Sequence, residues 1–463
     1  MLSETRTQVR IAIPVSLTTL CRVMVFTTDA AFIGHLGTPE LAAANLCGTI
    51  FDALIQFGFG ASIALATLCA QAHGVGNPRL VVAYFLIGLT SCAAISLIFI
   101  PVLLFATVPL LRVIGVADEV AQHASVFNRI YCLRYLPVVI FHVTRTYLTA
   151  QDDNTASLLV SLVTTALNVV LNYLAIVTLG LGLEGAALSS LITSVIQMVA
   201  LFAYVCCYYD LMNQIREGTA LFTKHRLHRF AEIAIGTFAS NAADSWVFTA
   251  VVIMAGLLGT SEVAAQGILY NLWSIMWSLY FGVGQAVQTR VSQTLGEGDS
   301  QSAFQSAVVG CLQTLGLSSL IGFIYWWTCP TACMLYTTDE TLIQYHYDLR
   351  WLVVGAYGCS ITAQTLLLIL DGCGRSTLSA GVAVLASGAV LLPLSYVFAF
   401  YLRWGLRGLW WASVSCEAFR VVVACGCVGG LRWDIEAIHT RQRMENAKQD
   451  RDSHASLNST FTE

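Results

Sequence analysis

The sequence predicts an all-α membrane protein of twelve transmembrane helices, arranged as two six-helix lobes related by internal duplication. Its 463 residues are 57% hydrophobic and only 11% charged, and the mean hydropathy is +0.71. A soluble domain carries roughly 25% charged residues, so lipid must cover most of a surface this poor in charge. Twelve apolar runs reach the length of about 20 residues that a helix needs to cross a bilayer.

The two halves of the chain repeat one another at an offset of 222 residues. Residues 29–43 match residues 251–265, and the register continues without a gap to the pair Gly76 and Gly298. Self-similarity over such a length indicates a tandem duplication. An even number of spans per copy gives both copies the same orientation in the membrane, which predicts two lobes related by an axis along the membrane normal.

The apolar runs define the expected spans and domain boundaries. The spans cover residues 11–34, 43–71, 80–110, 123–148, 156–180, 185–209, 230–258, 263–289, 304–330, 350–371, 377–402 and 408–431. We therefore expect an N-lobe over 11–209 and a C-lobe over 230–431, joined by a basic cytoplasmic linker over 210–229. Residues 1–10 form a cytoplasmic N-terminus, and the charged tail over 432–463 is predicted to be disordered.

The distribution of basic residues predicts the orientation of the chain. One side of the expected membrane collects most of the Lys and Arg residues, whereas the other side holds only Arg112, Arg403 and Arg407. Loops rich in Lys and Arg face the cytoplasm, so both termini are expected there. The sequence leaves open whether this integral multi-pass protein occupies the plasma membrane or a vacuolar or other endomembrane.

Several short motifs occur along the chain in a fixed order. The segment Asp29-Ala-Ala-Phe-Ile-Gly-His-Leu-Gly37 is followed by Glu40-Leu-Ala-Ala, and further motifs lie at 145–151, 182–187, 296–299, 371–375 and 405–410. Together they resemble the multidrug and toxic compound extrusion (MATE) family, in particular its eukaryotic members, and the first segment is similar to the family signature of spans 1 and 2. The likeness covers about residues 8–430. It implies a two-lobed antiporter that exports organic, often cationic, compounds in exchange for H⁺ or Na⁺.

Asp29 is the first candidate for cation coupling. A charged side chain in the bilayer core costs several kcal/mol, so an intramembrane acid suggests a function. The resemblance implies that an acid here acts with an Asn-x-x-x-Asp pair of span 5, which in this chain reads Asn168 and Asn172. The missing second acid favours H⁺ over Na⁺. The alternative is a structural ion pair of Asp29 with Arg22 or Arg134.

Asp244 in span 7 is the second candidate. Its surroundings, Asp244-Ser-Trp246-Val-Phe-Thr249, resemble a Glu-x-Trp-x-Tyr-Glu segment of eukaryotic members, with Thr249 replacing the second acid. The duplication aligns Asp244 with Arg22, so the two copies carry opposite charges at one equivalent position. The alternative is that Asp244 pairs permanently with Arg22 or Arg134.

Aromatic, amide and basic side chains in the spans are candidates for substrate binding. Aromatic rings attract organic cations through their faces, which favours Trp246, Tyr135 and Tyr270 together with the neighbouring Asn271. Buried arginines disfavour cations. Arg22 and Arg134 therefore either neutralise the acids at rest or indicate an anionic or zwitterionic substrate.

We expect a proton-coupled antiporter that works by alternating access of two lobes. It should bind a small organic substrate within a lipid bilayer as a monomer, without a cofactor, a metal ion or a nucleic-acid partner. The motifs of zinc proteases, serine hydrolases and nucleotide-binding loops are absent, so an enzyme is not expected. The alternatives are a lipid-linked oligosaccharide flippase of the same superfamily and a transporter of anionic or zwitterionic metabolites. The spacing of Cys329 and Cys333 leaves open whether they form a disulfide.

Overall fold

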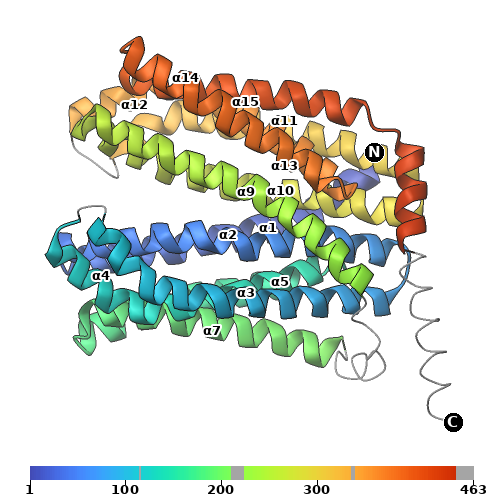
Figure 1. Ribbon diagram of the computed structural model, residues 1–463, viewed down its shortest axis with the longest axis horizontal. Helices are drawn as coiled ribbons and strands as arrows, with labels where there is room; N and C mark the ends of the chain where they lie inside the picture. The colour runs from blue at the N-terminus through green and yellow to red at the C-terminus, as the bar shows by residue number, and fades with distance from the viewer. Residues whose placement is uncertain (114–115, 210–223, 335–338, 445–463) are drawn as a thin grey trace. The chain divides into compact units, whose positions relative to one another are not determined.

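The computed structural model describes residues 1–113, 116–209, 224–334 and 339–444. All regular structure in these ranges is helical, with no strand (Figure 1). Helices dominate because they satisfy every backbone hydrogen bond internally where no water is available. Eleven of these helical stretches have the length and apolar composition of a membrane span. The expected span at 263–289 is not among them, although it lies within the 38-residue helix α10 (Thr260–Glu297).

The polar content of α10 explains this difference. Gln266, Gln285 and Gln288 all lie on it, and all three side chains are buried. These amides lower the mean hydropathy of the helix. Because they are buried, they do not lie on the outer surface of the folded unit. The length of α10 and its place in the second repeat make it the twelfth helix of the fold.

The chain forms two compact units whose boundaries differ from those of the expected lobes. The difference lies in the first helix of each lobe, which is divided between the two units. Unit 1 comprises residues 1–16 and 236–440, and unit 2 comprises residues 17–235 and 441–463. Three described helices therefore contribute to both units, namely α1 (Leu2–Gly34), α9 (Lys224–Leu258) and a helix at 433–444. Residues 224–229 belong to α9 rather than to a linker, and residues 210–223 lie outside the described ranges.

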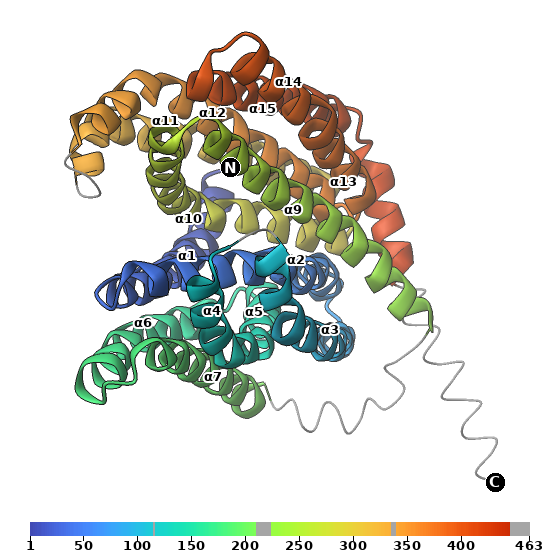
Figure 2. The same ribbon diagram turned by 60° about the vertical axis from the view of Figure 1, so that its left-hand side comes forward.

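Unit 2 is built around the elements of the first repeat (Figure 2). Besides its part of α1, it contains α2 (Thr38–Gly74), α3 (Pro78–Val113), α4 (Asp118–Tyr131), the 3₁₀ turn η1 (Cys132–Arg134), α5 (Tyr135–Thr149), α6 (Thr155–Asn172), the π-helical turn η2 (Tyr173–Thr178) and α7 (Gly182–Tyr208). Its core includes the fully buried Phe85, Tyr135 and Tyr147, together with Phe230 and Ile233 from the first turns of α9.

Unit 1 repeats this arrangement with the second copy. It contains α10, α11 (Ser300–Met334), α12 (Glu340–Gly372), α13 (Ser376–Leu385), the π-helical turn η3 (Ala386–Leu391), α14 (Leu392–Tyr396), the π-helical turn η4 (Val397–Tyr401) and α15 (Gly405–Gly429). The first turns of α1 complete it. Adding a Cβ to Gly282 on α10 would bring it within 2.0 Å of the Ala12 carbonyl oxygen, so this glycine permits the close approach of the two helices.

The duplicated turn at Gly76 and Gly298 is confirmed. Both glycines adopt a left-handed conformation, with φ of 71° and 82° respectively. The residue after each glycine then caps the next helix, because Asn77 accepts from the Leu80 amide and Asp299 accepts from the Gln301 and Ser302 amides. Hydrogen bonds from the hydroxyl and amide of Ser302 hold the pKa of Asp299 below its usual value.

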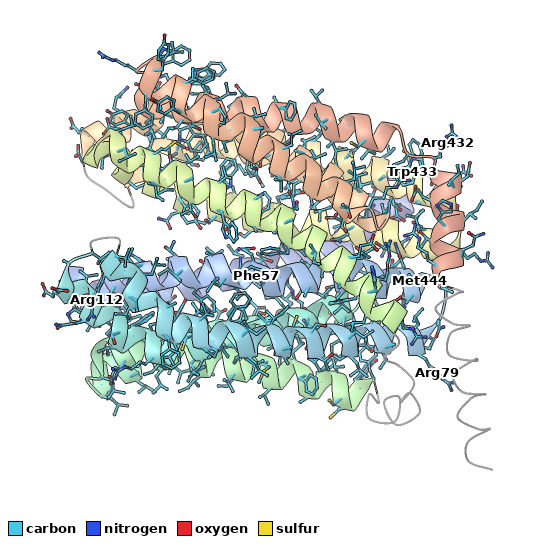
Figure 3. The ribbon with its side chains drawn as sticks, viewed as in Figure 1. Phe57, Arg79, Arg112, Arg432, Trp433 and Met444 are labelled. Atoms are coloured by element: carbon cyan, nitrogen blue, oxygen red, sulfur yellow. The ribbon has the colours of Figure 1, made fainter. Side chains whose placement is uncertain are left out.

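The start of the C-terminal tail is helical and not disordered as expected. Residues 433–444 form a helix that is in part buried (Figure 3). Glu436 is buried and pairs with Arg375, while Trp433 packs edge-on against Phe304 at 5.8 Å between ring centroids. These contacts provide the tertiary support that a short polar helix lacks by itself. The tail from 445 onwards lies outside the described ranges.

Candidate functional site

Asp29 lies on the buried face of α1. Val25 and Ile33, one turn before and one turn after it, have side chains only 4% and 2% exposed, and Asp29 itself is 7% exposed. Residues four apart share one face of a helix, so the apolar spacing of this segment turns the carboxylate into unit 2. Asp29 needs partners there, because a buried charge without them is strongly destabilising.

Three neutral side chains donate hydrogen bonds to this carboxylate. On α6, Asn168 Nδ2 and Asn172 Nδ2 lie 3.1 and 2.8 Å from Asp29 Oδ1. On α7, the Ser190 hydroxyl donates to Asp29 Oδ2. The pair predicted from its four-residue spacing therefore does face Asp29, and both of its amides are fully buried. We call Asp29, Asn168, Asn172 and Ser190 the Asp29 cluster.

The amide oxygens of the cluster have no partner of their own. Asn168 Nδ2 also approaches Thr193 Oγ1 at 3.4 Å, and Asn172 Nδ2 donates to the Asn168 carbonyl at 3.0 Å. The side-chain oxygens of both asparagines are buried and accept no hydrogen bond in the described part of the chain. Two acceptors thus stand unused beside the carboxylate, where they could receive a proton donor or a cation.

Neither arginine pairs with Asp29 in this structure. Arg134 donates through Nε to Ser194 Oγ and through Nη1 to Tyr131 Oη, both at 2.9 Å. The Arg22 guanidinium lies over the Phe59 ring, 5.4 Å from its centroid. Asp29 forms no ion pair with any described residue, so the structural pair considered as an alternative is not formed.

Tyr135 lies in the packed core of unit 2. Its side chain is fully buried, and its hydroxyl donates to the Leu54 carbonyl at 3.1 Å. The ring contacts Phe51 edge-on at 5.9 Å between centroids. A tyrosine whose ring and hydroxyl both have protein partners fits a packing role better than contact with a substrate.

The other candidates lie in unit 1. Trp246 on α9 is 47% exposed and meets Phe238 edge-on at 6.1 Å between centroids. Tyr270 on α10 is 44% exposed. The neighbouring Asn271 is also exposed, and its amide donates to the Gly267 carbonyl of its own helix at 3.1 Å. Asp244 lies on α9, and its side chain is outside the described part of the structure.

Sequence reasoning missed Ser190, the third donor to Asp29. A signal was present in span 6, where Ser189, Ser190, Thr193 and Ser194 interrupt an apolar run. Three- and four-residue spacings place polar residues on one face of a helix, and all four of these side chains are buried. A buried polar stripe beside an intramembrane acid is therefore worth including in a candidate site.

Comparison with known proteins decides the family. The sequence profile of the family described as MatE matches this chain twice, at residues 14–174 and 237–397. The chain belongs to the MatE family. The first match contains Asp29 together with Asn168 and Asn172 of α6, and the second contains Asp244.

Relatives and solved structures of MATE proteins cover nearly the whole chain. Protein DETOXIFICATION 35 of Arabidopsis thaliana is 26% identical over 451 residues, which cover 94% of this chain and 89% of the relative. Multidrug and toxin extrusion protein 1 of Homo sapiens is 26% identical over 438 residues, covering 93% and 75%. The crystal structure of the eukaryotic MATE transporter AtDTX14 has a TM-score of 0.86 at 20% identity, covering 96% and 99%. The chain is thus a multi-pass membrane transporter with the twelve-helix, two-lobed MATE fold.

Proposed function

We propose that this MATE transporter is a proton-coupled antiporter that exports organic compounds by alternating access of its two lobes. The observation that carries the proposal is the Asp29 cluster, a buried carboxylate that accepts hydrogen bonds from three neutral donors and forms no ion pair with a described residue. A carboxyl group of this kind can be ionised or protonated, and the same neighbours can form hydrogen bonds to either form. Asp29 is the residue that we expect to bind and release the proton.

The chemistry of the cluster supports a proton as the coupling ion. An ionised carboxylate in this position has lost its hydration, and neutral donors replace that hydration only in part. Binding a proton removes the charge and creates a new O–H donor. Either Asn168 or Asn172 can accept from it after its amide turns over, because both amide oxygens have no other partner among the described residues. The ion pair that would fix Asp29 in its charged form is absent from the described part of the chain.

The same cluster gives less support to Na⁺. A hard cation takes several oxygen ligands, with carboxylates preferred. The resemblance implies a second acid at the position of Asn172, but this chain has an amide there, so the cluster supplies a single negative charge. All three neighbours direct hydrogens at that charge. A proton needs no further ligand.

The substrate class rests on the relatives and on two exposed rings. Relatives named multidrug and toxin extrusion protein 1 support an organic substrate. The half-exposed Trp246 and Tyr270 offer faces that attract organic cations. The exposed Arg22 supports the second candidate, an anionic or zwitterionic substrate.

The test is transport by purified protein in liposomes under an imposed pH gradient, with ethidium as the organic cation. We expect Asp29→Asn to reduce gradient-driven uptake at least tenfold, because this isosteric change removes the proton-binding group and keeps the shape of the cluster. Asp118→Asn is the matched control, since this exposed acid lies in the first turn of α4. Its uptake should stay within twofold of wild type. Asp244→Asn, assayed in parallel, reports whether the second lobe also couples.

Three results would contradict parts of the proposal. Full pH-driven uptake by Asp29→Asn would remove this residue from coupling. Uptake that follows a Na⁺ gradient but not a pH gradient would replace the proton by Na⁺. No ethidium movement by wild type under either gradient would favour an anionic substrate or the flippase activity.

A further inference from the structure

An arginine occupies a strained position in the turn before α15. Arg403 has φ of 55° and Gly405 has φ of 58°. The equivalent turn of the first repeat, before α7, has Gly180 at 66° and Gly182 at 56°. The left-handed region suits glycine, whereas a side chain makes it unfavourable. The second repeat thus keeps an arginine where the first repeat has the residue that the backbone prefers.

The two turns are otherwise built alike. In the first, the Leu179 amide donates to Leu174 and the Leu181 amide to Ala175. In the second, the Leu402 amide donates to Val397 and the Trp404 amide to Phe398, in the same pattern. The backbone therefore gives no reason for the arginine. Strain that persists in a folded protein often marks a site of function.

Arg403 lines a cavity of about 540 Å³ at this end of unit 1. Among the described residues it forms no hydrogen bond or ion pair. Arg407, in the first turn of α15, also lines the cavity, and its only ion pair among the described residues is a long one of 3.9 Å to Asp348. The first repeat has Gly180 and Glu184 at the equivalent positions, so the two cations are specific to the second repeat. Guanidinium groups match the geometry of phosphate.

The cavity also contains negative charge. Glu262 and Asp348 line it together with Tyr345, whose hydroxyl donates to Glu262 at 3.3 Å. Two arginines and two acids thus share one cavity. A ligand that carries both a phosphate and an ammonium group would satisfy both sets of charges, whereas a simple anion would satisfy only one.

Aromatic side chains around the cavity place it at a membrane interface. Trp404 and Trp351 are 48% and 45% exposed, and Tyr401 is 78% exposed. Tyr347 near the start of α12 is exposed as well, and the same part of α12 contributes Tyr345 and Asp348 to the cavity. Tryptophan and tyrosine gather at the level of lipid headgroups.

We propose that this cavity binds the headgroup of a zwitterionic phospholipid from the surrounding bilayer. The phosphate lies between Arg403 and Arg407, and the ammonium group faces Asp348 and Glu262. The exposed Trp404 supports the glycerol and the first part of the acyl chains. This site is separate from the Asp29 cluster, which belongs to the other unit.

The test uses the purified, delipidated full-length protein and native mass spectrometry with phosphatidylethanolamine. We expect Arg403→Gln combined with Arg407→Gln to weaken phosphatidylethanolamine binding at least tenfold. Arg112→Gln is the matched control, because Arg112 is an exposed arginine at the end of α3 in unit 2 (Figure 3). Its binding should stay within twofold of wild type. The melting temperature of each variant, measured without lipid, shows that it is folded.

The other lipids and a soluble headgroup distinguish the alternatives. Phosphatidylglycerol, which lacks the ammonium group, should bind more weakly than phosphatidylethanolamine, and soluble phosphoethanolamine should compete poorly. Equal binding of phosphatidylglycerol would overturn the role of the two acids. Strong competition by phosphoethanolamine would show a site for a free organic phosphate. Unchanged lipid binding by the folded double variant would refute the site altogether.

Discussion

Asp29 is accommodated by three short polar side chains from two neighbouring helices. Ser190 and the two asparagines reach the carboxylate from α7 and α6, and the Asn172 amide is anchored at the Asn168 carbonyl. Short side chains lose little conformational entropy when they are ordered. The geometry around Asp29, the proposed proton-binding group, can therefore be kept without an ion pair to a described residue.

At the scale of single residues, replacing Arg403 with glycine should stabilise the protein. A residue with a Cβ loses about 1–2 kcal/mol in the left-handed conformation, although glycine returns part of this through its greater freedom in the unfolded chain. We expect a net gain of about 1 kcal/mol, measured as a higher melting temperature in detergent. Arg403→Ala is the control, because it removes the guanidinium but keeps the strained backbone. Equal melting temperatures of the two variants would argue against strain.

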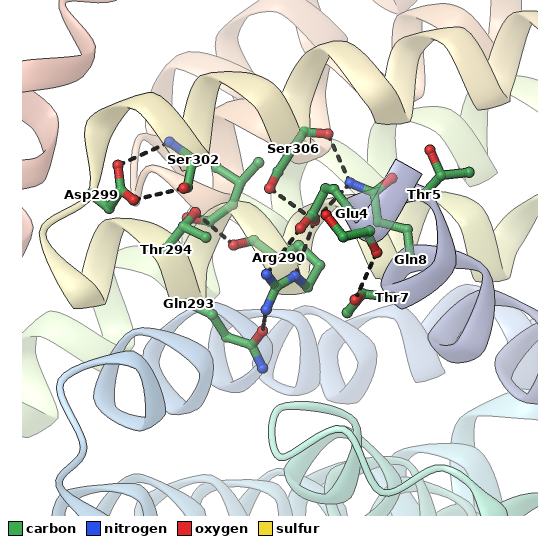
Figure 4. A network of polar contacts seen from close by, with 12 residues as sticks. Glu4, Thr5, Thr7, Gln8, Arg290, Gln293, Thr294, Asp299, Ser302 and Ser306 are labelled. Atoms are coloured by element: carbon green, nitrogen blue, oxygen red, sulfur yellow. Dashed lines mark hydrogen bonds and ion pairs between the residues drawn. The ribbon is translucent and has the colours of Figure 1, made fainter. Parts of the chain in front are cut away.

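At the scale of helices, a polar network holds the first turn of α1 within unit 1 (Figure 4). Arg290 on α10 donates to both oxygens of Glu4, each at 3.0 Å. Ser306 on α11 and Gln8 on α1 also donate to Glu4, at 2.9 and 3.3 Å. The two charged side chains are only 14% and 18% exposed. Two parallel hydrogen bonds between an arginine and a carboxylate are stronger than a single one.

Removing the charge of Glu4 should weaken this docking. Glu4→Gln removes the negative charge beside the largely buried Arg290 guanidinium, which also donates to Gln293. Breaking a fully buried pair costs about 3–5 kcal/mol, so we expect about 2 kcal/mol here, seen as a lower melting temperature. Glu232→Gln is the control, because Glu232 is 47% exposed in its pair with Arg229. Exposed pairs contribute at most about 1 kcal/mol. Equal losses in both variants would contradict a special role for the network.

The positions of the helices could be predicted from the sequence, but their contacts only in part. The apolar runs and the repeated glycine turns predicted the spans, since both depend on local residue patterns. The Asn168 and Asn172 pair was predicted to face Asp29 from its spacing and the family resemblance. Ser190 and the hydrogen bonds of Arg134 to Ser194 and Tyr131 were missed, because they depend on how each helix is rotated against its neighbours. The helix at 433–444 was missed because its support comes from distant residues such as Arg375.

At the scale of the whole molecule, the two repeats share one backbone arrangement but carry different charged side chains. Gly180, at a left-handed position of the first repeat, corresponds to Arg403 in the second, and Glu184 corresponds to Arg407. The backbone of this turn is thus retained while its side chains diverge. This divergence gives the turn before α15 two positive charges that the turn before α7 lacks.

The orientation expected from the basic residues can be tested with an existing thiol. Cys207 is exposed in the last turn of α7, on the side that the basic loops assign to the cytoplasm. In a Cys425→Ser background, which removes the other exposed thiol, a membrane-impermeant maleimide should label Cys207 only after cells are permeabilised, and adding Cys207→Ser should abolish that labelling. Trp404→Cys, at the opposite end of the spans, should be labelled in intact cells. The reverse pattern would show that the termini face outwards.

Sharing α1 and α9 between the units has a consequence for the origin of the fold. Each unit is completed by the first turns of a helix whose remainder belongs to the other unit. A single-repeat ancestor would have had to exchange these turns with a second copy, as domain-swapped dimers do. Fusion of the two copies made that exchange intramolecular, so the two partners meet at a high effective concentration. Gene duplication would thereby have turned an assembly step that depends on protein concentration into a step of folding.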